Sequence, residues 1–214
     1  GRAADEIIAE AASGDYALIV MASRGRRGFA RLLFGSVASR LARYAPVPVL
    51  IVKAAVPDRA ARRVLACTSG DERGERAARW GGQLARWLKA EVMLLHVLSQ
   101  IGLAPAARLE ELYETAAQAM AQGTREGRHL ARLIELVREQ GVTTAIEPKL
   151  RNGLVLDEIV AEVKEGDYDV VIIGAHEPPE PRESWAGLGA YLLDDVADQI
   201  ISAVRKPVLV IRGQ

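Results

Sequence analysis

The chain repeats part of its own sequence, and this repeat restricts the folds open to it more than any other feature. Residues 5–21 read DEIIAEAASGDYALIVM, and residues 157–173 read DEIVAEVKEGDYDVVII. A second match follows in the same order, since VPVLIVK at 47–53 resembles KPVLVIR at 206–212. Two long matches in one order predict two copies of a single domain.

Between these matches, apolar runs alternate with amphipathic stretches. Short apolar runs that end in turn residues are typical of buried strands, and apolar residues at helical spacing predict helices. The expected strands lie at 17–21, 49–52, 64–68, 91–98 and 143–150, and the expected helices at 5–12, from Ser36 to Pro46, at 72–89 and at 105–140, the last with a break near Gly123 and Gly127. Alternating strands and helices indicate an α/β fold with a parallel sheet.

The segment 54–62 separates the two copies. It is poor in apolar residues and contains Pro57, which suits a linker. The expected organisation is a partial first copy at 1–53 and a complete second copy at 63–214. Because position 1 corresponds to position 153, roughly 90 residues of the first copy have no counterpart in the sequence if the copies are of equal length.

The charge balance excludes some classes of function. Lys+Arg and Asp+Glu number 28 each, so bulk charge attracts neither a nucleic acid backbone nor an anionic membrane. The single cysteine, Cys67, excludes a disulfide framework, and no cluster has metal-ligand spacing. The sequence shows no leader and no apolar run of membrane-spanning length, so we expect a cytoplasmic protein without membrane or nucleic acid partners.

The stretch 22–37, ASRGRRGFARLLFGSV, predicts an anion site. It follows a strand and leads into a helix that starts near Ser36, so the loop and the first helical turn hold unpaired N–H donors. Its arginines are either a polyphosphate clamp or a solvated surface: Arg24, Arg26, Arg27 and Arg31.

Three parts of the sequence resemble the universal stress protein family: 15–53, 64–98 and the two helices that begin with DEI. The resemblance implies a five-stranded parallel sheet flanked by helices, Rossmann-like and similar to the adenine nucleotide alpha hydrolases. ATP-binding members carry Gly-x2-Gly-x9-Gly-Ser/Thr after the fourth strand. Here the pattern falls on Ala22, Gly25, Gly35 and Ser36, with alanine at the first position and Val37 after the last, which implies an ATP site in the first copy.

The second copy departs from that pattern. Ser69 stands where the family has an aspartate after the first strand. Gly174 matches the first motif glycine, but Glu177 replaces the second, and Asp194 and Asp195 replace Gly-Ser. Carboxylates near a phosphate repel it, so we expect this site to be closed or repurposed. With Glu180, these carboxylates either hold a divalent cation or form a loosely acidic loop.

A few other side chains allow both a structural and a functional interpretation. His96 lies in a strand and is expected in the core, whereas His176 follows a strand, where ligands of open α/β sheets bind, or is a loop residue without a role. Cys67 is expected to be a small buried side chain, and Trp80 and Trp87 to make packing or partner contacts.

The leading functional hypothesis is a universal stress protein that acts as a nucleotide-binding or regulatory module. Because the first copy lacks its first two strands, we expect this chain to bind ATP weakly or not at all. One alternative is a structural module that pairs through its last strands, 49–52 and 208–211, within one chain or in a homo-oligomer. Another is a slow ATP hydrolase, although no catalytic motif stands out and a dedicated enzyme is not expected.

Overall fold

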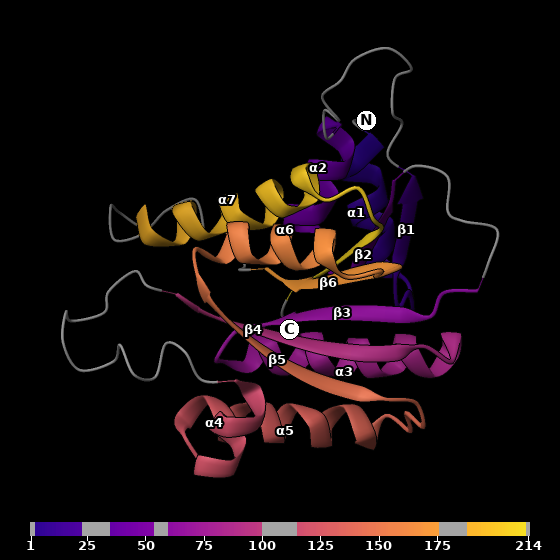
Figure 1. Ribbon diagram of the computed structural model, residues 1–214. Helices are drawn as coiled ribbons and strands as arrows, with labels where there is room; N and C mark the ends of the chain where they lie inside the picture. Colours follow the sequence, from indigo (N-terminus) through magenta and orange to yellow (C-terminus); the bar gives the residue numbers. More distant parts are fainter. Residues whose placement is uncertain (1–2, 23–34, 54–59, 100–114, 176–187, 213–214) are drawn as a thin grey trace. The chain divides into compact units, whose positions relative to one another are not determined.

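The computed structural model describes residues 3–22, 35–53, 60–99, 115–175 and 188–212 (Figure 1). The chain divides into two compact units. One comprises residues 59–172, and the other combines residues 1–58 with residues 173–214. The described residues form seven helices and seven strands, and the α/β fold expected from the alternating pattern is confirmed.

The unit at 59–172 is built on parallel strands. β3 (Arg63–Thr68) pairs with β4 (Glu91–Ser99), and β4 pairs with β5 (Ile146–Gly153). At the other edge of β3, the Asp169 N–H donates to the Arg63 carbonyl at 2.9 Å, which brings in the start of β6 (Val170–Gly174). Val64, Leu65 and Ala66 of β3 are fully buried, as expected of a strand covered on both faces.

Four helices belong to this unit: α3 (Glu72–Leu88), α4 (Ala116–Gln122), α5 (Arg125–Glu139) and α6 (Val155–Glu165). The predicted break in the long helical stretch is confirmed. Gly123 ends α4 with a φ of 64°, and Thr124 caps α5 by accepting from the Gly127 N–H. Gly127 itself lies inside α5, where a Cβ would collide with the Ala119 carbonyl, so it permits close contact of the two helices.

The other unit contains α1 (Ala3–Ser13), β1 (Ile19–Ala22), α2 (Ser36–Tyr44), β2 (Val49–Val52), α7 (Leu188–Ala203) and β7 (Val208–Ile211). β1 and β2 are parallel. β2 pairs with β7, as predicted for the last strands of the two copies, with Leu50 opposite Leu209. This pair is antiparallel, so the expectation of a purely parallel sheet is wrong here. The strand count is seven rather than five because β1 and β2 of the first repeat add to the five that follow.

The repeat is visible in matching contacts. Tyr16 donates its hydroxyl to Glu10 at 2.7 Å, and Tyr168 donates to Glu162 at 2.5 Å. In each case the glycine two residues before the tyrosine lies against its ring, where a Cβ would come within 3.0 Å. The same three residues, a glutamate, a glycine and a tyrosine, therefore make matching contacts at the ends of α1 and α6.

Burial distinguishes the two tyrosines. Tyr168 is 1% exposed, whereas Tyr16 is 49% exposed. Around Tyr168, the buried Glu162 also accepts from Lys149 at 2.6 Å and from Arg151 at 2.7 Å, and the Arg63 guanidinium lies 5.0 Å from the tyrosine ring. Burial opposes ionisation of Glu162, but these hydrogen bonds outweigh it and lower the pKa of the carboxyl. In the described part of the chain no basic side chain pairs with Glu10.

Matching cations flank the β2–β7 pair. Lys53 follows β2 and is 3% exposed, and its Nζ donates to the Val204 carbonyl at the end of α7 at 2.6 Å. Arg212 holds the corresponding place after β7 and donates to the Ala42 carbonyl of α2. Burial lowers the pKa of Lys53 to about 8. The residue that follows each of these two strands therefore donates to a carbonyl in or just after a helix from the other end of the sequence.

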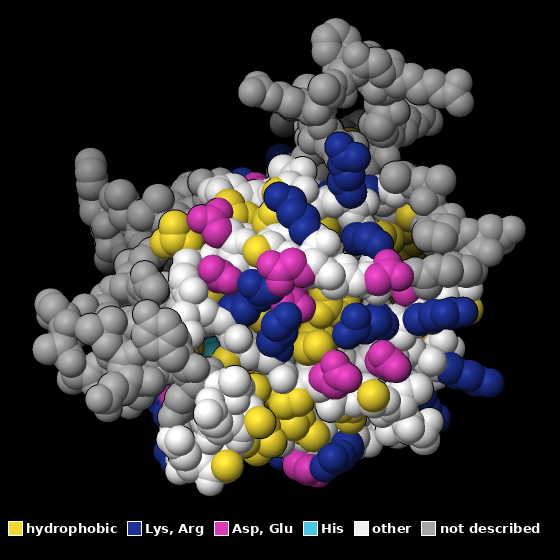
Figure 2. Space-filling model, viewed as in Figure 1, with side chains coloured by type: hydrophobic (Ala, Val, Ile, Leu, Met, Phe, Trp, Pro, Cys, Tyr) yellow, Lys and Arg dark blue, Asp and Glu magenta, His cyan; other side chains and the backbone are white. Residues whose placement is uncertain are grey.

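On the face shown in Figure 2, basic and acidic side chains are interspersed rather than gathered by sign. This distribution agrees with the balanced composition. Among the helices described, none has both the length and the apolar character needed to cross a bilayer.

Candidate functional site

The start of α2 carries the described half of the predicted anion site. Gly35 is the N-cap residue with extended backbone, φ −65° and ψ 147°, and no side chain caps the helix there. The Gly35 carbonyl accepts from the Ser39 N–H at 2.9 Å, and the first turn has no acidic residue. An N-terminus with uncapped N–H donors and no nearby carboxylate favours an anion.

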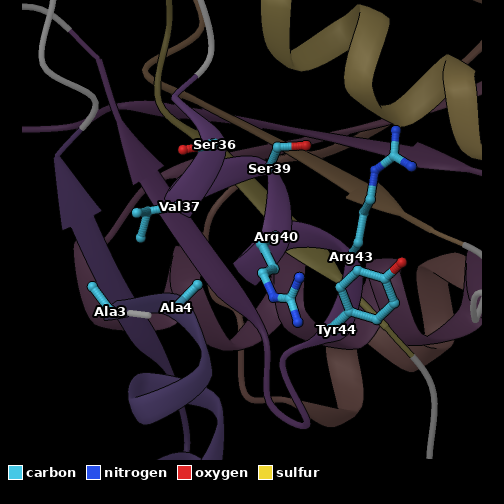
Figure 3. Close-up of a pocket in the computed structure, with 8 residues that line it drawn as sticks. All are labelled: Ala3, Ala4, Ser36, Val37, Ser39, Arg40, Arg43 and Tyr44. Carbon is cyan, nitrogen blue, oxygen red and sulfur yellow. The ribbon is translucent and has the colours of Figure 1, made fainter. Parts of the chain in front are cut away.

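A cavity of about 670 Å³ runs along α2 (Figure 3). Its walls come from α2 and from the first residues of α1: Ser36, Val37, Ser39, Arg40, Arg43, Tyr44, Ala3 and Ala4. Ser36 and Ser39 lie toward the N-terminal end of the helix, and Tyr44 lies at the other end. Hydroxyls, guanidinium groups and an aromatic ring therefore share one opening.

The two arginines of this cavity are held by carboxylates. Arg40 pairs with Asp5 at 2.6 Å and stacks over Tyr44, with 5.7 Å between the guanidinium carbon and the ring centroid. Arg43 donates from Nε to Asp198 of α7 at 3.0 Å. Paired arginines give less attraction to an incoming anion than free ones, so the anion-binding capacity of this cavity rests mainly on the helix start.

The structure describes four of the five predicted site residues. Ser36 and Val37 line the cavity, Gly35 caps α2, and Ala22 ends β1, paired with Val52. A Cβ at Gly35 would meet no atom within 4 Å, so the described neighbours do not require glycine there. Gly25 lies outside the described residues, as do Arg24, Arg26, Arg27 and Arg31.

In the second copy, the turn after β3 is occupied by its own hydrogen bonds. Asp71 caps α3 by accepting from the Arg73 N–H at 3.1 Å, and Ser69 donates its hydroxyl to Asp71 at 2.6 Å. Burial opposes ionisation of Asp71, but bonds from Arg73 and Ser69 hold the pKa of the carboxyl well below its usual range. The Ser69 hydroxyl predicted to replace the family aspartate is thus directed to a helix cap.

The acidic positions of the second copy are only partly described. Asp194 and Asp195 fall in α7, in the stretch whose side chains the structure does not describe. His176, Glu177 and Glu180 lie outside the described residues. Among the described residues, no group of three or more His, Cys, Asp or Glu side chains could hold a metal ion.

A second, smaller cavity of about 190 Å³ lies at the carboxyl end of β4. It is lined by His96, Val97, Leu98 and Ser99 of β4, by Gly70, and by Arg125, Glu126 and His129 of α5. His96 is buried, which confirms its expected place in the core. His129 was not singled out from the sequence, because a histidine on a charged helix face carries no local signal of its neighbours.

The remaining candidates are structural in the described chain. Cys67 is a free, buried thiol whose pKa is raised by burial, as expected of a core residue. Trp87 of α3 is exposed, whereas Trp80 is partly buried on the same helix. Neither tryptophan lines either of the two cavities.

The comparison with protein families gives one match. A model described as the universal stress protein family matches residues 1–53 and 60–212. A search of curated proteins found no match.

Several solved structures similar to this chain are universal stress proteins. One from Archaeoglobus fulgidus DSM 4304 is 21% identical with a TM-score of 0.62, and the match covers 98% of this chain and 64% of that protein. The universal stress protein UspA from Lactobacillus plantarum is 15% identical with a TM-score of 0.51, over 72% of this chain and 100% of its own. A third structure, a universal stress protein in complex with cAMP, is 18% identical with a TM-score of 0.51. The match covers 73% of this chain and 100% of that protein. At these identities the likeness shows the fold, and this chain spans about two thirds of the length of the Archaeoglobus protein.

Proposed function

Because this chain belongs to the universal stress protein family, we propose that it is a tandem member whose first copy carries an adenine nucleotide site and whose second copy has lost its phosphate loop. The tandem organisation is supported by the family match, which leaves out only residues 54–59 between its two ranges, within the segment expected to link the copies. It is also supported by the Tyr16–Glu10 and Tyr168–Glu162 contacts, which occupy equal places in the two repeats.

The observation that carries the nucleotide proposal is the start of α2. In the first copy, Gly35 and Ser36 open α2 with uncapped donors and no first-turn carboxylate, and Ser36 borders a cavity. At the positions that match Gly35 and Ser36 in sequence, the second copy has Asp194 and Asp195, which lie inside α7 rather than at its start. A phosphate is attracted to a helix start with free N–H donors and no carboxylate, and the second copy lacks the Gly-Ser pair that opens α2.

The proposed ligand is ATP or a related adenine nucleotide, held by Ala22, Gly25, Gly35, Ser36 and Val37. The cAMP complex of a protein with this fold supports the class of ligand. We propose a binding or regulatory module rather than an enzyme, and the unpaired thiol of Cys67 suits a reducing compartment such as the cytoplasm.

The test is nuclear magnetic resonance of the full chain titrated with Mg-ATP to millimolar concentration. The amides of Gly35, Ser36 and Val37 should shift, while those of Asp194 and Asp195 should not. Gly35→Asp should abolish the shifts and the matched change Asp194→Gly should leave them. Equal effects of the two substitutions, or shifts confined to the second copy, would contradict the assignment.

A structural role is the second candidate, and the β2–β7 pair favours it. This pair, with Lys53 and Arg212 reaching across it, joins the two copies inside one chain. If the last strands already form their hydrogen bonds with each other inside one chain, neither is left to pair with a second chain. Light scattering should then give a mass that is independent of protein concentration. A dimer that dissociates on dilution would show that other surfaces mediate self-association.

A further inference from the structure

The cavity at the carboxyl end of β4 lies apart from the residues proposed to bind a nucleotide. All of its lining residues belong to the unit at 59–172, and two of the chain's three histidines, His96 and His129, face it from β4 and α5. Their ring centroids are 5.2 Å apart, with the planes inclined by 59°. Two imidazoles at one cavity are a potential ligand pair for a transition metal ion.

The hydrogen bonding of His96 fixes which of its nitrogens is available. Its Nδ1 lies 3.1 Å from the Thr68 carbonyl, and a carbonyl only accepts, so Nδ1 carries the proton. Nε2 is then left with a free lone pair. A ligating histidine usually donates its other N–H to a backbone carbonyl or carboxylate, which orients the ring and raises its basicity. The side chain is 8% exposed, so the ring is held in place by the core around it.

His129 supplies the complementary feature. Its Nε2 is buried and has no hydrogen-bond partner among the described residues. Buried polar atoms are nearly always paired with protein, water or an ion, so this nitrogen can take a partner from the cavity that His129 lines. The lone pair of a neutral imidazole nitrogen can coordinate a metal cation, which would give this atom a partner.

We propose that this cavity binds a divalent first-row transition metal ion, with Zn²⁺ as the probe, through Nε2 of His96 and Nε2 of His129. At Zn–N distances of about 2.0–2.1 Å, two imidazoles on one tetrahedral ion have ring centroids about 5 Å apart. The observed separation is of this size. No third side chain completes a cluster in the described residues, so water or a small ligand fills the open positions.

The charges at the rim set how the site responds to substitution. Glu126 and Arg125 both line the cavity and carry opposite charges. Glu126→Gln should weaken binding of the cation and Arg125→Gln should strengthen it, because each acts on the ion through the field at the rim.

The experiment is a Zn²⁺ titration of the metal-free full chain in competition with a chromophoric chelator. One Zn²⁺ per chain is expected, with Mg²⁺ unable to compete because it prefers oxygen ligands. His129→Gln and His96→Gln should each weaken the affinity by about tenfold or more. The matched control is the third histidine, since His176→Gln should leave the affinity unchanged.

Because His96 is buried and its variant can lose the fold, His129→Gln is the decisive substitution, with circular dichroism to confirm that it is folded. As a second readout, the side-chain ¹⁵N spectrum of the wild-type chain should show Zn²⁺ shifting Nε2 of two histidines. The proposal is overturned if folded His129→Gln binds as tightly as the wild type, if His176→Gln abolishes binding, or if no Zn²⁺ binds at a concentration well above that of the protein.

Discussion

The hydroxyl of Tyr168 offers a direct measurement of what burial adds to a contact that the chain contains twice. Tyr168→Phe removes only the hydroxyl, and the ring can keep its place beside Arg63. The hydroxyl donates to Glu162 at 2.5 Å in a fully buried position. Hydrogen bonds to charged groups contribute about 1.5–3 kcal/mol, and here water cannot replace the lost donor. We expect a loss of about 2 kcal/mol in the free energy of unfolding.

The repeat provides the matched control. Tyr16→Phe removes the same group from the same partner type, the Glu10 carboxylate at 2.7 Å, but Tyr16 is half exposed. Water takes the place of the hydroxyl there, so the expected loss is below about 0.5 kcal/mol. The two substitutions thus differ in environment rather than in chemistry.

Urea denaturation at neutral pH measures both losses from the midpoint and slope. Combining Tyr168→Phe with Glu162→Gln completes a double-mutant cycle, and a coupling of about 1 kcal/mol or more is expected if the hydroxyl acts through this carboxylate. Equal losses from Tyr168→Phe and Tyr16→Phe would refute the argument, as would a coupling near zero.

Three further outcomes follow from the same contacts. Gly166→Ala should lower the free energy of unfolding, measured by urea denaturation, by about 2–3 kcal/mol because the new Cβ meets the fixed Tyr168 ring. Gly14→Ala should lower it by about 1 kcal/mol or less because the exposed Tyr16 ring can move. Equal losses from the two substitutions would contradict this reasoning. Lys53 has a pKa of about 8 in the folded chain against about 10.4 unfolded, so the unfolded chain binds more protons between these values. Wild-type stability should therefore rise by about 2 kcal/mol relative to Lys53→Met between pH 8 and pH 10.5, and parallel pH curves for the two proteins would disprove it. In the ATP titration, Gly35→Asp should remove the amide shifts that Asp194→Gly leaves intact.

The sequence was most informative where local pattern decides structure. The apolar runs at 64–68 and 91–98 are β3 and β4, and Gly123 ends a helix where its freedom at positive φ suggested a break. The pairing of the last strands, 49–52 and 208–211, also agrees with the structure. Their antiparallel direction did not follow from the pattern, because strand direction depends on how distant segments meet.

The contacts that depend on distant segments could not be predicted in this way. Nothing local to Lys53 indicates that its amine is buried against the end of α7, and nothing local to His129 indicates that it faces His96. Asp71 caps α3 in the structure, a role that was not predicted from the sequence. At the candidate site, Ser36 and Val37 share a cavity, while the role of Gly25 stays a prediction.

The reciprocal contacts of Lys53 and Arg212 have a consequence for how the two halves can vary. In a dimer of identical subunits, every substitution near the twofold axis occurs on both sides at once. Here the two sides are separate positions of one chain, and they already differ: lysine reaches one helix and arginine the other. Covalent linkage thus removes the requirement for symmetry, and a harmful change in one half can be tolerated while its counterpart is kept intact.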